Sequence, residues 1–125
     1  MMDQPAAHEI VSVVREFIEQ KVMPELKGHS AFHARVAANA LGIVARELEQ
    51  GPAAAEAEHA RLKALLGADG SLADLNRELA ARIRDERIAL DDPALKDHLA
   101  RTTFAKVAID QPGYSGLKAA LAMKD

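Results

Sequence analysis

Apolar residues recur every three to four positions through almost the whole chain, and the alternation typical of strands is nearly absent. This spacing is the period of a helix that buries one face. Aromatic residues make up only 3% of the chain and tryptophan is absent, so a core must be built from Leu, Ile, Val and Ala. The pattern therefore predicts an all-α fold, in which abundant alanine lets helices approach closely.

Glycine and proline divide this pattern into segments. Pro24, the pair Gly51–Pro52, Gly67 and Asp92–Pro93 are typical helix stops or starts, and Ser71 with Asp74 resembles a capping box. They predict helices over 5–23, 30–50, 52–66, 71–87 and 92–110. The tail over 113–125 either adds a helical turn or frays. Because the loops are short, we expect a single-domain antiparallel bundle of about five helices.

Size and charge exclude several classes of protein. The chain has 125 residues, enough for one domain with its own core. A net charge of −3 gives no basic surface for nucleic acid, and the absence of cysteine excludes disulfides and thiolate metal sites. No apolar stretch reaches the ~20 residues that span a membrane. The N-terminal residues do not resemble a secretory signal, so we expect a cytoplasmic protein.

One polar cluster could carry chemistry, in the segment around His33. On a helical wheel His33 lies near the middle of the apolar side, and Arg35 and Asn39 are four residues apart. As a binding site, the three would hold an anion or a carbonyl through a guanidinium, an amide and a proton donor. The structural alternative is a buried histidine and an Arg–Asn pair that fix helix packing.

Metal binding has weaker candidates. His29 and His33 have the i, i+4 spacing of two ligands on one helix, and Glu56 with His59 forms a Glu-x-x-His pair. A di-iron bundle needs two such pairs and two further glutamates, and the alternative is that these side chains are solvated. We therefore expect no metal and no cofactor.

The remaining polar residues give no catalytic signature. Glycines are isolated from any phosphate-binding motif, and no serine lies in a nucleophile elbow, so the sequence assigns no catalytic residue. A strip of arginines alternates with acidic residues, which is typical of a solvated, salt-bridged face rather than a nucleic-acid surface. The strip contains Arg77, Arg82, Arg84 and Arg87, with Glu78, Asp85 and Glu86 between them.

The segment from Phe32 to Leu41 (FHARVAANAL) resembles the characteristic segment of a small, uncharacterised bacterial family of helical proteins. The similarity continues at Leu75–Asn76, at Asp91–Pro93 and from Lys106 to Asp110, and so covers nearly the whole chain. Members of this family are typically encoded beside acyl-CoA dehydrogenases and beside kinases resembling aminoglycoside phosphotransferases. The resemblance implies a role near acyl-CoA metabolism and assigns no residue a function.

Three hypotheses follow. The first is a non-enzymatic accessory or protein-interaction module, which binds a partner protein or a second copy of itself through helix faces. The second is a binder of an anion or acyl-thioester, or a minor enzyme, that uses His33, Arg35 and Asn39. The third is a metal-binding bundle that uses His29, His33, Glu56 and His59.

Overall fold

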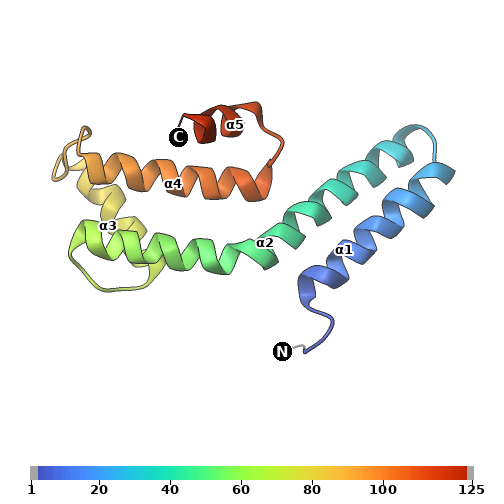
Figure 1. Ribbon diagram of the computed structural model, residues 1–125, viewed down its shortest axis with the longest axis horizontal. Helices are drawn as coiled ribbons and strands as arrows, with labels where there is room; N and C mark the ends of the chain where they lie inside the picture. Colours follow the sequence, from blue (N-terminus) through green and yellow to red (C-terminus); the bar gives the residue numbers. More distant parts are fainter. Residues whose placement is uncertain (1–2, 124–125) are drawn as a thin grey trace. The chain divides into compact units, whose positions relative to one another are not determined.

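The computed structural model describes residues 3–123, which form helices and connecting turns without a β-strand (Figure 1). The five α-helices of this part of the chain confirm the predicted all-α fold. The predicted packing into one antiparallel bundle stays a prediction. The helices are α1 (Ala7–Phe17), α2 (Gly28–Leu66), α3 (Leu72–Arg84), α4 (Pro93–Asp110) and α5 (Ser115–Ala122).

The chain groups into two compact units. Unit 1 contains the described residues up to Gly51 together with Ile109–Gln111. Unit 2 contains Pro52–Ala108 and the described residues from Pro112 onward. None of the described helices is both long enough and apolar enough to cross a membrane.

The predicted helix break at Gly51–Pro52 is wrong, because α2 is helical from Gly28 to Leu66 with Pro52 inside it. Proline removes one helical hydrogen bond and crowds the carbonyl group four residues earlier, but its fixed φ angle is itself helical. Three alanines follow Pro52 and favour helix. The same dipeptide nevertheless marks the division between the two units.

Pro24 ends the first helical segment close to the predicted position. α1 is followed by a π-helical turn over Ile18–Val22 and a 3₁₀ turn over Met23–Glu25. Pro24 has no N–H to donate to the carbonyl of Gln20, so the regular hydrogen-bond ladder cannot continue there. At the other end of α2, Gly67 adopts a left-handed φ of 62° and donates to the carbonyl of Lys63 at 2.9 Å, as expected for a C-terminal cap.

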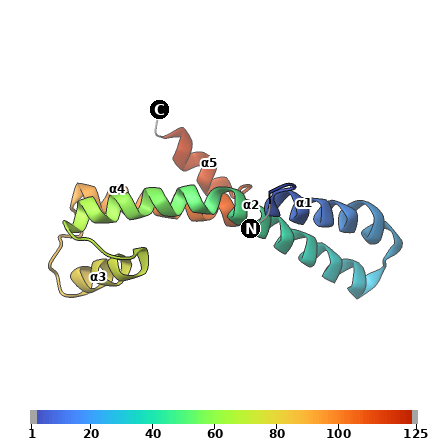
Figure 2. The same cartoon turned by 90° about the horizontal axis from the view of Figure 1, so that it is seen from below.

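Unit 1 has very little core. α1 lies beside the first part of α2 in both views (Figures 1 and 2), and a Cβ added to Gly42 would lie 2.9 Å from Nη1 of Arg15. The side chain of Ala38 is 1% exposed and that of Ile109 is 8% exposed, while α1 itself buries no residue.

Arg46 donates hydrogen bonds to the carbonyls of Ile109 (2.5 Å) and Asp110 (3.2 Å) and so caps the end of α4.

Unit 2 is built around leucines. The end of α2 lies beside α4, which runs in the opposite direction, and α3 packs beneath them (Figure 2). Ser71 begins α3 as predicted, since its Oγ accepts from the N–H of Asp74 at 3.1 Å. Asp92 begins α4 by accepting from the N–H of Leu95 at 2.9 Å. The buried core consists of Leu62, Leu66, Leu75, Leu79 and Leu95.

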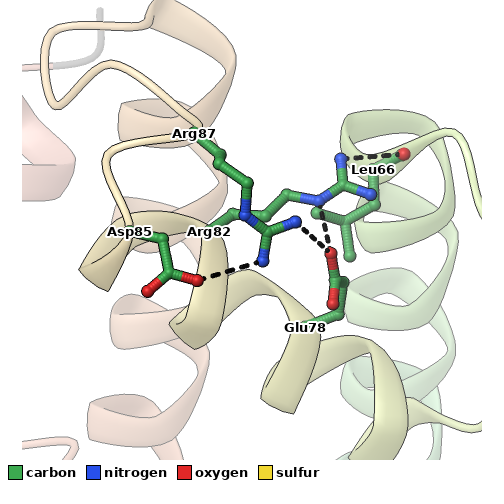
Figure 3. Close-up of polar contacts among 5 residues, drawn as sticks. All are labelled: Leu66, Glu78, Arg82, Asp85 and Arg87. Atoms are coloured by element: carbon green, nitrogen blue, oxygen red, sulfur yellow. Dashed lines mark hydrogen bonds and ion pairs between the residues drawn. The ribbon is translucent and has the colours of Figure 1, made fainter.

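The arginine strip of α3 forms ion pairs, as predicted, and also ties α3 to α2 (Figure 3). Oε1 of Glu78 accepts from Nε of Arg82 at 2.7 Å and from Nη1 of Arg87 at 3.1 Å. The hydrogen bond from Arg82 is the main reason why the pKa of Glu78 lies below its usual value. Arg82 also donates to the carbonyl of Leu66 at 3.1 Å, which satisfies a free carbonyl at the end of α2.

The C-terminal segment adopts the helical alternative. α5 extends over Ser115–Ala122 and buries Leu117, and residues 124 and 125 of the predicted tail lie outside the described part of the chain. The ring of Tyr114 lies against Gly116, where an added Cβ would be 2.5 Å from Cε1 of the ring. Gly116 therefore allows a close approach that no other residue permits without moving the ring.

Candidate functional site

The predicted cluster lies on the surface of α2. His33, Arg35 and Asn39 are all exposed, and the ring of His33 meets that of Phe32 edge-on at 5.7 Å. His33 is therefore not the buried histidine of the structural alternative, although its position on the helical wheel is central to the apolar side. Phe32 itself is 61% exposed. No hydrogen bond joins Arg35 to Asn39 among the described residues, so the structural alternative is not found either.

Asn39 is the member of this cluster that lines a cavity. The cavity has a volume of about 330 Å³ and is lined by Arg15, Asn39, Ile43, Arg46, Asp110 and Gln111, all in unit 1. Both cations already have partners, since Arg15 pairs with Glu19 at 3.0 Å and Arg46 caps α4. The lining includes neither His33 nor Arg35. Ligand binding by His33, Arg35 and Asn39 together stays a prediction.

The weak metal candidates are separately engaged or exposed. Nε2 of His59 donates to the carbonyl of Gly70 at 2.8 Å and holds the loop between α2 and α3. His29 and Glu56 are exposed. Among residues 3–123, no three histidine, aspartate or glutamate side chains are placed to hold one metal ion.

An exposed apolar stripe runs along α1. The periodicity of this segment predicts one apolar face. In the structure, its apolar residues lie on two faces, one half-buried and one exposed. Val11, Ile18 and Val22 are half-buried, whereas the second stripe is 40–65% exposed. That second stripe, at i, i+3, i+4 and i+7, consists of Ile10, Val13, Val14 and Phe17. We call it the α1 stripe.

The first part of α2 also leaves apolar side chains exposed. Those more than 40% exposed are Phe32, Val36, Val44 and Leu48. Unit 1 therefore exposes large apolar side chains on both of its helices. Unit 2 has a buried core of five leucines, although Leu90, Leu99 and Leu121 of the same unit are exposed.

A second cavity, in unit 2, was missed by sequence reasoning. It has a volume of about 250 Å³ and is lined by Arg61, Ala64, Leu65, Ala94, Asp97 and His98. His98 is 3% exposed, although Leu99 beside it in the sequence is 45% exposed. The signal was the spacing of Leu95, His98 and Thr102 at i, i+3 and i+7, which places His98 on the buried side of α4.

The surroundings of His98 favour its neutral form. Burial lowers the pKa of the imidazole, and the positive charge of Arg61 lowers it further. Glu58 and Asp97 raise the pKa by smaller amounts, and Lys106 lowers it slightly. Arg61 donates from Nη2 to Oγ1 of Thr102 at 3.2 Å. The site thus combines a neutral imidazole with a guanidinium.

Comparison with known proteins places the chain in a family without assigning it a role. No curated protein and no solved structure matches the chain. A family model described as a domain of unknown function, DUF6285, matches residues 24–114. This segment contains α2, α3 and α4, and hence both Asn39 and His98. The chain belongs to the DUF6285 family.

Proposed function

We propose that the chain is a non-enzymatic protein-interaction module and that the α1 stripe is its contact surface. One observation carries this proposal: α1 buries no residue, yet four of its apolar side chains form a continuous exposed stripe. Contiguous apolar surface of this kind is typical of protein–protein interfaces. Fully burying one Val or Phe side chain contributes roughly 1.5–3 kcal/mol. The side chains of the stripe are 40–65% exposed, so covering each of them contributes part of that amount.

The partner we propose first is a second copy of the chain. Unit 1 contains two neighbouring helices with almost no core, and two such pairs can complete a four-helix bundle. A two-fold axis would place each α1 stripe against the same surface of the other copy. The resemblance to a bacterial family supports a cytoplasmic role near acyl-CoA metabolism. It gives an acyl-CoA dehydrogenase or a phosphotransferase-like kinase as the alternative partner.

The test adds one charge to the stripe. Val13→Asp places a carboxylate where Val13 is 65% exposed, and burying it in an interface costs several kcal/mol. The control, Ser12→Asp, adds the same charge to an exposed position on the opposite face of α1. Light scattering after size exclusion should show dimers for the wild type and for Ser12→Asp, and monomers for Val13→Asp.

If the wild type is monomeric, binding to the two alternative partners is measured instead. An acyl-CoA dehydrogenase and a phosphotransferase-like kinase, the two enzymes that the family resemblance implies, should then bind the wild type and Ser12→Asp, but not Val13→Asp. If neither enzyme binds and the protein stays monomeric at every concentration, the proposed function is wrong. The ligand-binding hypothesis for His33, Arg35 and Asn39 has support only in the cavity lined by Asn39.

A further inference from the structure

Two buried nitrogen atoms at the unit 2 cavity have no hydrogen-bond partner. They are Nε of Arg61 and Nδ1 of His98, and both residues line the cavity. Buried polar atoms in folded proteins are almost always hydrogen-bonded, so an unpaired pair beside one cavity indicates a missing partner. His98 is 3% exposed, and burial lowers the pKa of its imidazole.

The type of missing partner follows from these atoms. Nε of a guanidinium can only donate a hydrogen bond, and Nδ1 of a neutral imidazole donates in one of its two tautomers. In the tautomer that carries the proton on Nδ1, a ligand that satisfies both atoms brings two acceptors. A carboxylate has this arrangement and carries the charge that Arg61 prefers.

The two carboxylates near the cavity already have hydrogen-bond donors. The carboxylate of Asp97 accepts from Nε of Arg101 at 2.9 Å. Glu58 accepts from Nδ2 of Asn76 at 2.9 Å. Lys106 adds positive charge near His98. The guanidinium of Arg61 is thus the cation that lines the cavity.

The rest of the lining is aliphatic. Ala64, Leu65 and Ala94 form apolar walls, and a volume of about 250 Å³ exceeds the ~150 Å³ in which an apolar cavity holds benzene. We propose that this cavity binds a small organic carboxylate with a short aliphatic tail, with the carboxylate on Arg61 and His98 and the tail against the three walls. The two nitrogens are covered by neighbouring atoms, so binding includes a rotation of the Arg61 side chain.

This site is independent of the proposed interaction function, because it lies in unit 2 and the α1 stripe lies in unit 1. The probe is butyrate, titrated at constant ionic strength. Binding is measured by NMR from the ring nitrogen signals of His98. These signals are assigned as those that disappear in His98→Gln. Butyramide, which keeps the tail and lacks the charge, and inorganic phosphate, which lacks the tail, are the comparators.

We expect butyrate to shift the His98 signals with saturation, and butyramide and phosphate to leave them unchanged. Arg61→Met should weaken butyrate at least about ten-fold, which corresponds to the loss of ~1.4 kcal/mol. Arg84→Met is the matched control, because Arg84 is an exposed arginine of the same unit outside the cavity lining, and it should bind as the wild type does.

A second variant covers the case in which Arg61→Met does not fold. Ala94→Leu enlarges an exposed residue of the cavity wall without changing any charge, and it should abolish the butyrate shift. The proposal is overturned if butyrate leaves His98 unchanged, if phosphate binds as well as butyrate, or if Ala94→Leu binds as the wild type does.

Discussion

Glu86 adopts a backbone conformation that usually belongs to glycine. Its φ angle is 56°, and it follows Asp85, the C-cap residue of α3. The N–H of Arg87 donates to the carbonyl of Arg82 at 2.8 Å and that of Glu86 to the carbonyl of Ile83 at 3.3 Å, which is the Schellman pattern of a helix end. A side chain in this left-handed conformation costs about 1–2 kcal/mol.

Glu86→Gly should therefore stabilise the protein by about 1 kcal/mol, because glycine adopts this conformation without steric strain. Urea unfolding measures the change. Glu86→Ala removes the same charge from the helix end but keeps the Cβ atom. If alanine stabilises the protein as much as glycine does, charge rather than backbone conformation is responsible.

His98 makes stability depend on pH. Its pKa is lowered in the folded protein by burial and by Arg61, so the unfolded chain binds more protons between the lowered pKa and the ordinary value of 6.5. Stability contributed by neutral His98 is present above pH 6.5 and is lost as the pH falls through the folded-state pKa. The slope from one proton cannot exceed about 1.4 kcal/mol per pH unit.

His98→Gln keeps a polar side chain that does not titrate. Urea unfolding between about pH 5 and 7 should show that wild-type stability falls more steeply with acidification than that of His98→Gln. Parallel slopes for the two proteins would show that His98 does not carry this dependence.

At the scale of the helix, Pro52 lies inside α2 but has no backbone N–H for the helical hydrogen bonds. Pro52→Ala supplies an N–H that can donate to the carbonyl of Leu48, and it should stabilise the protein by up to about 3 kcal/mol. Pro93→Ala is the control, because Pro93 is the first residue of α4 and replaces no helical hydrogen bond there. Equal effects at the two positions in thermal unfolding would contradict this explanation.

Helix ends and helix burial differ in how far the sequence predicts them. Ser71, Gly67 and Asp92 were predicted correctly because a cap depends on residues three or four positions away. Gly51–Pro52 also has the local pattern of a helix end, but the residues on both sides favour helix and α2 continues through it. Local pattern therefore identifies most ends and misses the interruption that a long helix tolerates.

At the scale of the whole molecule, the candidate site was harder to predict than the fold. His33 and His98 both follow helical apolar spacing, yet His33 is exposed and His98 is buried. The difference depends on which helix face another segment covers, and that segment is distant in sequence. Arg61 and Thr102, for example, are joined across α2 and α4. Spacing gives the face of a helix but not what packs against it.

The two units should differ in local stability. Unit 2 has a leucine core, whereas α1 of unit 1 buries no residue. Backbone amides of α1 should therefore exchange with solvent much faster than those near Leu62 and Leu95 when the protein is dilute. Exchange measured at rising protein concentration should slow in α1 of the wild type and remain fast in Val13→Asp. Equal protection of both units in dilute protein would contradict this prediction.

The packing of Tyr114 against Gly116 has a spectroscopic consequence. The chain contains one tyrosine and no tryptophan, so its intrinsic fluorescence comes from this one ring. The emission therefore reports on the surroundings of this ring at the start of α5, and the leucine core contributes no fluorescence. Tyrosine fluorescence therefore follows the start of α5 without any added label.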